Sequence, residues 1–528
     1  MALGTPRKLS GRRMVSIDIS KEQFMQDPIK FTKEFLGQCI GIHNKNVRDF
    51  KYLEKEYLGD HDIFEKERAD ASNINNITVE NHLHKIVDFQ TGFTVGRPIE
   101  YSYKGEKEAD DMTYFKRYLQ DSKKGSLDIV LYRSKFLYGI GHRMIISRRN
   151  DFDDEQEAPF ELINVDNKDC FVAHSSNTEK EELFGCVITK IYDIETKTSE
   201  NLYTIYLTNG YYFSLKGTEY KVYENLTSQS ITFNPLIECP LNEHRTGLPE
   251  LVLLLQHAVN GVDSMELDDI EQFISCFIVF ENQEIDEEFL ANLAELKKQR
   301  ALAIKTTNPN APAKVSFLSA SLDHTNINSY YERLITAMYD ITSTPKASGS
   351  VTSGGDTTGA RLLGNGWESA QNQAEVTTGY MVSNEYEQLK RMFEICKYTS
   401  DKLDEIYPSE IEIKYNINMS NNLLVKTQSL QNLDNIKMPE EIALNMVGLT
   451  NDNHGVANQW KANKQEADEK AINEMQQAVD NKVNENSTDK TEWPVRENLN
   501  RKWEETHAKK QECEKTHTQK KETRKWKN

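Results

Sequence analysis

The chain has 528 residues, which is too long for one compact core and predicts several domains. Its formal net charge of −19 argues against a protein whose whole surface grips nucleic acid, because phosphate contacts need clustered Lys and Arg. The charge is compatible with a protein that surrounds DNA without holding it, since a negative lining repels phosphate and lets a duplex slide.

The N-terminal part predicts helices. Residues 1–20 look disordered, and apolar residues then recur at helical spacing over 21–58. The polar, Asn-rich stretch 60–76 predicts a loop. Another helix is expected over 79–92, where a glycine supplies a C-terminal stop, and two more fit the apolar pattern of 108–140.

A change of character follows. Within 143–226, short β-type runs alternate with turn residues, which predicts a mostly β domain. In this region the sequence Leu207-Thr-Asn-Gly-Tyr211 predicts a tight hairpin, because Asn-Gly adopts the positive φ values that a two-residue turn needs.

The C-terminal half predicts helices again. One long helix is expected over 248–280, a small α/β unit with two strands follows it, and helical spacing returns at 327–341. The stretch 343–359 is rich in Gly, Ser and Thr and lies between helices, which predicts a mobile internal loop. A long helix is expected over 360–401. Past Lys461 the polar composition predicts a solvated helix or a disordered tail.

Nothing in the composition indicates export or a membrane. The seven cysteines form no CxxC pair and have no zinc-like spacing to histidine, which predicts free thiols in a reducing cytoplasm. The basic N-terminus lacks the apolar core of a secretory signal, and no apolar stretch is long enough to cross a bilayer. We therefore expect a soluble intracellular protein.

Three segments invite a chemical interpretation. The Gly-rich stretch 349–359 lacks the Gly-Lys-Ser/Thr ending of a phosphate loop, which favours a flexible loop over a nucleotide site. His82 and His84 point to different faces of a helix, which favours a surface pair over a metal site. A basic tail could touch nucleic acid or an acidic partner, although a solvated end is the commoner explanation: Lys509, Lys510, Lys520, Lys521, Arg524, Lys525 and Lys527.

An acidic cluster lies in the middle of the long helix expected over 248–280. Its carboxylates could bind a metal ion for hydrolysis, line a channel, or form an ordinary solvated stretch of helix. The sequence leaves these three interpretations open for Asp263, Glu266, Asp268, Asp269 and Glu271.

The segment 81–101 resembles the signature of bacteriophage portal proteins, of the type found in long-tailed phages of Gram-positive bacteria. In that family a helix with an Ile-Val-Asp core leads into Gly-(aromatic)-x-x-Gly-x-Pro, which Gly92, Gly96 and Pro98 match. We expect Gly92 to end the helix, and Gly96 and Pro98 to shape a turn before an extended run. The Gly/Ser-rich stretch 343–359 is longer and richer in Gly and Ser than the corresponding loop of the family pattern. Further landmarks agree in order and spacing at 138–144, 234–242, 259–273, 343–345 and 358–362.

The resemblance implies an α+β, mainly helical portal fold that assembles as a ring with wing, stem, clip and crown regions. In chain order its expected parts are a disordered N-terminus (1–20), a wing (21–245, with a mostly β subdomain at 143–226), a stem helix (246–280), a small α/β clip (281–325), a second stem helix (326–342), a tunnel loop (343–359), a long wing helix (360–401), a helical crown (402–460) and a polar, flexible tail (461–528).

The resemblance further implies a homododecameric ring at one capsid vertex of the virion, assembled in the host cytoplasm, through which double-stranded DNA is packaged and ejected. The terminase large subunit, which hydrolyses ATP, would dock on the ring, a head-completion or adaptor protein would bind the clip, and the major capsid and scaffolding proteins would contact it. No cofactor, catalytic residue, metal ligand or membrane contact is expected.

The same resemblance assigns residues to the channel. The stem helix would present Asp263, Glu266 and Asp269 to the DNA. The alternatives are a metal-dependent DNA-processing enzyme and a structural or adaptor protein of the head without a channel. The DNA-facing residues of the tunnel loop would be Ser348, Gly349, Ser350, Val351, Thr352, Ser353, Gly354, Gly355 and Asp356.

Overall fold

The computed structural model shows two compact units, which divide after Ser420. Three expectations lie outside the described residues: the DNA-facing residues Ser348–Asp356 of the tunnel loop, the helix and first strand expected in 286–305, and the basic tail. The residues that the structure describes are 9–67, 74–104, 111–148, 157–193, 197–229, 231–274, 277–281, 312, 314–318, 324–346, 366–399, 403, 406–417, 423–436, 438–447 and 453–485.

Most strands of the predicted β subdomain lie in a six-stranded sheet, in which all neighbours are antiparallel except β1 and β5. The strands expected at 143–147 and 160–165 belong to a separate three-stranded sheet. The predicted hairpin between β7 and β8 is confirmed, but its turn is not the expected two-residue type. Three residues separate the strands, and of Asn209 and Gly210 only Gly210 has positive φ, at +80°. The disorder expected for residues 1–20 is wrong for the part that the structure describes, residues 9–20, because β1 pairs with β5 and its residues Val15 and Ile17 are buried. In sheet order the strands are β1 (Val15–Ile17), β5 (Cys170–Ser175), β6 (Glu182–Asp193), β7 (Thr198–Leu207), β8 (Tyr211–Lys216) and β9 (Lys221–Ser228).

Two helices, α1 (Lys21–Phe24) and α2 (Pro28–Tyr57), pack against this sheet. The sequence predicts one helix here, and the structure divides it because Pro28 has no N–H for a helical hydrogen bond. The side chain of Asp27 caps the new helix by accepting a hydrogen bond from the N–H of Lys30 at 3.1 Å.

A second core lies among three helices and a three-stranded sheet. The fully buried Arg143 donates to Asp128 at 2.6 Å and to Gln388 at 2.9 Å, so this core contains charges as well as apolar side chains. A pair of short antiparallel strands, β2 (Glu100–Tyr103) and β13 (Ile411–Lys414), adds to it. The helices are α4 (Asp111–Asp121), α5 (Lys124–Tyr138) and α10 (Trp367–Thr399), and the sheet order is β10 (Leu236–Pro240), β3 (Ile140–Ser147) and β4 (Phe160–Val165).

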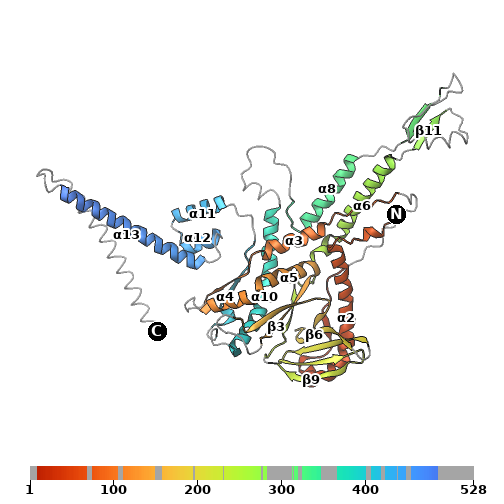
Figure 1. Cartoon of the computed structure of the whole chain (residues 1–528), viewed down its shortest axis with the longest axis horizontal. Coiled ribbons are helices and arrows are strands. Elements are labelled where there is room, and N and C mark those ends of the chain that lie inside the picture. Colours follow the sequence, from red (N-terminus) through yellow and green to blue (C-terminus); the bar gives the residue numbers. More distant parts are fainter. Residues whose placement is uncertain are drawn as a thin grey trace. The chain divides into compact units, whose positions relative to one another are not determined.

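Two helices, α6 (Leu248–Ile274) and α8 (His324–Ile341), lie side by side and share an apolar cluster with α3 (His82–Val95) (Figure 1). The prediction of one helix over 248–280 is wrong at its C-terminal end, where the structure has a strand. The helix α6 ends at Ile274, and the following strand β11 (Phe277–Glu281) pairs antiparallel with β12 (Lys314–Leu318). The apolar run around Phe277 fits both a helix and a strand, and its distant partner strand decides between them.

The helix α3 also ends later than expected. Gly92 lies inside it, and the helix continues to Val95 with Gly96 as its C-terminal cap. Gly96 and Pro98 lie in the bend between α3 and β2, before the extended run that was expected there. The expectation that Gly92 stops the helix is therefore wrong, while Gly96 takes that position.

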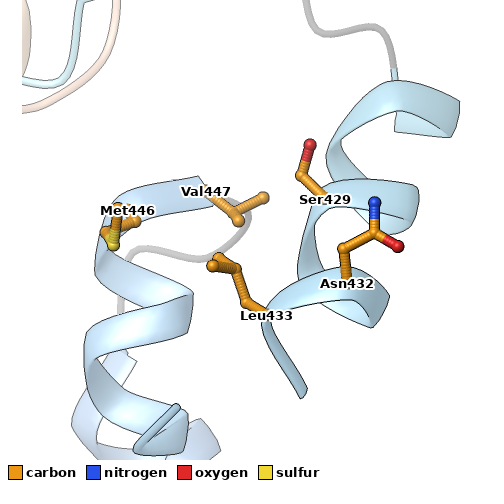
Figure 2. A pocket seen from close by; sticks show the side chains of 5 residues that line it. All are labelled: Ser429, Asn432, Leu433, Met446 and Val447. Atoms are coloured by element: carbon orange, nitrogen blue, oxygen red, sulfur yellow. The ribbon is translucent and has the colours of Figure 1, made fainter. Parts of the chain in front are cut away.

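The second unit is helical. It contains α11 (Leu423–Asn435), α12 (Glu440–Val447) and α13 (Asn453–Glu485). The boundary expected near residue 461, between the crown and the polar tail, falls inside α13. The solvated helix that was predicted past this point is present up to Glu485. A shallow hollow between α11 and α12 has no charged residue in its lining, which is Ser429, Asn432, Leu433, Met446 and Val447 (Figure 2).

Five of the seven cysteines are described, and all five are buried free thiols, as the sequence predicts. Burial raises the pKa of the Cys39 thiol to about 12, so this thiol stays protonated and unreactive near neutral pH. No helix in the described part of the chain is long and apolar enough to cross a bilayer.

Candidate functional site

The acidic cluster of α6 separates into buried and exposed members. Asp268 is 1 % exposed, and its Oδ2 lies 2.7 Å from the ammonium of Lys66. Asp263, Glu266 and Asp269, which were expected in the channel wall, are partly exposed. Glu271 is exposed and accepts a hydrogen bond from the side chain of Asn76 at 2.7 Å. Asp268 is therefore a buried structural residue, while the three predicted lining residues are partly exposed.

Asp268 is the last of four buried polar residues that recur at every fourth position of α6: Gln256, Asn260, Ser264 and Asp268. Residues four apart lie on one face of a helix, so the four side chains form a line. We call this line the polar seam. The sequence contains this spacing, but without the structure nothing distinguishes it from an ordinary solvated face.

The polar seam binds the backbone of the segment 76–82, with one side chain for every second residue. Gln256 accepts a hydrogen bond from the N–H of His82 at 3.0 Å, and Asn260 accepts one from the N–H of Glu80 at 3.3 Å. The remaining two bonds run from the N–H of Thr78 to Ser264 at 3.0 Å and from the N–H of Asn76 to Asp268 at 2.6 Å. The stretch 60–76 was expected to be a loop. The backbone of its last residue, Asn76, is hydrogen-bonded to the polar seam.

Negative charge gathers beside the polar seam. Burial raises the pKa of Asp263, and the nearby carboxylates Glu80 and Glu266 raise it further. Burial also raises the pKa of Tyr331 on α8, together with its hydrogen bond to Glu80. The partly exposed carboxylates of α6 thus form a connected negative region at the contact with α8, which is the kind of surface that repels phosphate.

His82 and His84 have separate partners. His82 lies 2.9 Å from the Tyr339 hydroxyl through Nδ1 and 2.9 Å from Glu80 through Nε2, and it is partly buried. His84 is exposed and stacks on Tyr57 with ring centroids 4.5 Å apart. The prediction that the two rings face different ways is confirmed. Calling both of them surface residues is wrong for His82, because α8 covers it.

The flanks of the predicted tunnel loop are both attached to α3. On the first side, the side chain of Gln90 donates to the carbonyl oxygen of Thr342 at 2.9 Å. On the second side, Trp367 lies against Phe89 and Phe93, with ring centroids 5.8 Å and 6.0 Å apart. The structure therefore brings the two ends of the stretch 343–366 to one helix, which local sequence patterns do not indicate.

A comparison with models of protein families identifies the family of this chain. Residues 36–470, well over half of the chain, match the model of the family described as "Phage portal protein, SPP1 Gp6-like". The chain belongs to this phage portal protein family. Portal proteins of this family are structural components of the virion, and the membership supports an oligomeric ring assembly in a phage head.

The chain was also compared with curated proteins and with solved structures. No curated protein matches the chain. A solved structure titled "Neck of empty GTA particle computed with C6 symmetry" contains a chain with 10 % sequence identity and a TM-score of 0.39. That similarity covers 70 % of this portal family member and 90 % of the other chain.

Proposed function

We propose that this chain forms a closed homododecameric ring at one capsid vertex, through which double-stranded DNA is packaged and ejected. The observation that carries the proposal is the family match over residues 36–470. In the proposed ring α6 and α8 form the stem, the β11–β12 pair belongs to the clip, and α11 and α12 belong to the crown. The terminase large subunit would dock on the ring, and an adaptor protein would bind the clip.

Exposed apolar side chains on α6 support assembly. Leu254 is 61 % exposed and Ile270 is 41 % exposed. Leu251, Met265 and Leu267 are exposed as well, so α6 carries an apolar surface of the kind that marks a protein–protein contact. Neighbouring copies in a closed ring would cover it, because heterologous contacts that close on themselves leave no subunit without a partner.

The DNA-facing roles are part of the same proposal. Asp263, Glu266 and Asp269 would give the channel a negative wall, and the segment Ser348–Asp356 would narrow it around the duplex. The support for the wall is the partial exposure of these three carboxylates beside the negative region of Glu80. A negative wall lowers friction on DNA because it does not bind phosphate.

Electron microscopy of the purified chain tests the proposal. Rings with a central hole are expected, and Leu254→Glu together with Ile270→Glu should reduce them to smaller species. A monodisperse monomer at high protein concentration would contradict the ring. Nuclease activity with Mg²⁺ or Mn²⁺ would instead favour the DNA-processing enzyme, and a closed assembly without a hole would favour a structural or adaptor protein of the head.

A further inference from the structure

A buried carboxylate near the end of α2 lacks the partners that such a group needs. Glu56 is 0 % exposed, and neither of its side-chain oxygens accepts a hydrogen bond of good geometry. Its ion-pair contacts among the described residues are with histidines: Nε2 of His257 lies 3.2 Å away and Nδ1 of His61 lies 3.6 Å away. A buried carboxylate without a counter-charge is strongly unfavourable, so a protonated histidine or a bound cation must supply positive charge beside Glu56.

His61 does not supply that charge. Its Nδ1 lies 2.7 Å from the side-chain nitrogen of Asn260. The oxygen of Asn260 faces the other way, because it accepts from Gln256 at 2.9 Å and from the N–H of Glu80 at 3.3 Å. The Asn260 nitrogen therefore donates to His61, and a ring nitrogen that accepts a hydrogen bond carries no proton.

A second carboxylate completes a set of donor atoms. Asp62 belongs to the short helix η1 (Asp62–Glu65), and the hydroxyl of Tyr52 donates to its Oδ2 at 2.7 Å. One ligand atom from each of Glu56, Asp62 and His257 lies within 4.8 Å of the other two. Metal–ligand bonds of about 2.0–2.2 Å place two ligands of one ion roughly 3–3.5 Å apart. The distance of 3.2 Å between Glu56 and His257 is already of that size.

We propose that Glu56, Asp62 and His257 bind a divalent transition-metal ion of the Zn²⁺ or Mn²⁺ type. Two carboxylates and one neutral imidazole balance the two positive charges of the ion, which removes the uncompensated charge of Glu56. The imidazole disfavours Mg²⁺ and Ca²⁺, which prefer oxygen ligands alone. Tyr52 holds Asp62 in place through its hydrogen bond, and a partner of this kind orients a metal ligand.

The ion would join two neighbouring elements to a third that is distant in sequence. Glu56 is on α2, Asp62 is on η1, and His257 is on α6, next to the first residue of the polar seam, Gln256. A bound metal would fix α6 to the helix that packs on the β subdomain. The role is structural, and it does not depend on the proposed passage of DNA.

Metal analysis of the full-length protein tests the site. Chelator-treated protein is dialysed against Zn²⁺ or Mn²⁺, and the bound metal is measured by mass spectrometry. We expect about one ion per chain and a higher thermal unfolding midpoint, because a ligand that binds the folded state stabilises it. Mg²⁺ and Ca²⁺ should give no shift. His257→Gln and Asp62→Asn should each lose roughly tenfold or more in affinity.

His84→Gln is the matched control, since His84 is an exposed histidine that also lies beside a carboxylate, Asp88 at 3.2 Å. This variant should bind metal as the wild type does. Equal binding by His257→Gln and the wild type would overturn the proposal, as would a wild type that binds neither ion and melts at the same temperature with metal and with chelator. If His257→Gln does not fold, the visible spectrum of Co²⁺-loaded wild type decides. A thiolate charge-transfer band, or no bound Co²⁺, would exclude this ligand set.

Discussion

Replacing Asp268 by Asn should strongly destabilise the first unit, because it leaves the Lys66 ammonium buried without a counter-charge. The side chains of the pair are 3 % and 2 % exposed, and the two charged atoms are 2.7 Å apart. Asn keeps the shape of Asp and can still accept a hydrogen bond from the N–H of Asn76, so the change isolates the charge. Removing one partner of a buried pair costs about 3–5 kcal/mol. That is a large part of the roughly 5–15 kcal/mol by which a domain is stable.

Urea unfolding followed by circular dichroism measures this loss, with all variants compared at one protein concentration because assembly adds stability. Asp269→Asn is the matched control. It changes the next residue, which is partly exposed, and it should alter the unfolding free energy by no more than about 0.5 kcal/mol. Lys66→Met combined with Asp268→Leu should recover most of the loss, since both charges are then gone. A loss for Asp268→Asn no larger than for Asp269→Asn would refute the reasoning.

Four other changes test the turn, the loop, the pKa of Asp263 and the acidic wall. Gly96→Val should lower soluble yield, because a Cβ there would overlap the carbonyl oxygen of Gly92, whereas Gly92→Ala has open space inside a helix and should gain up to about 1 kcal/mol in urea unfolding; equal behaviour would contradict this. Deleting 350–356 should leave rings intact in micrographs but block DNA packaging, and loss of rings would count against a loop role. Asp263→Asn should raise the urea midpoint at neutral pH. The raised pKa of Asp263 means that folding favours its protonated form, so its unfavourable effect is absent below its ordinary value of 3.8 and grows as the pH rises through the folded value; identical pH profiles would contradict this. Asp263→Lys with Glu266→Lys should slow DNA passage, and unaltered packaging would remove both residues from the channel wall.

Local rules predicted the elements whose causes are local. The Asn-Gly turn before Tyr211 requires positive φ whatever surrounds it, and the structure has the hairpin there. Gly92 shows the limit of such rules, because a glycine is compatible with a helix end but does not force one. Four residues later Gly96 ends the helix, where the chain must bend before β2. A sequence with two glycines in one turn of helix does not say which of them is the stop.

Long-range partners decide what local rules leave open. The carboxylates of α6 look alike in the sequence, and Asp268 differs from Asp269 only because Lys66, 202 residues away, lies beside it. The candidate metal ligands were missed for the same reason. Glu56 and Asp62 sit at the end of a helix and in a polar stretch, and His257 lies in an apolar part of α6, so no motif with fixed spacing connects them.

The polar seam also connects α6, the predicted stem helix, to the segment 76–82, which leads through α3 to the predicted tunnel loop. Four helical residues rise about 6.0 Å, and two residues of extended chain span roughly 6.4–6.8 Å. The mismatch is about 0.4–0.8 Å per step, which adds up to roughly 1–2 Å over three steps. Side chains absorb it here, since all four bonds remain between 2.6 Å and 3.3 Å. The seam stops where α6 presents Val252 to the apolar cluster that it shares with α3.

The segment bound by the polar seam runs directly into α3, and α3 holds both flanks of the predicted tunnel loop through Gln90 and Phe93. A slide of α6 past this segment would break all four bonds together, at about 0.5–1.5 kcal/mol for each. It would also separate Lys66 from Asp268, which costs more than any one of those bonds. Small displacements of α6 must therefore carry α3 with them. We expect a displacement of α6 to be transmitted to the flanks of the predicted tunnel loop by this one continuous piece of chain.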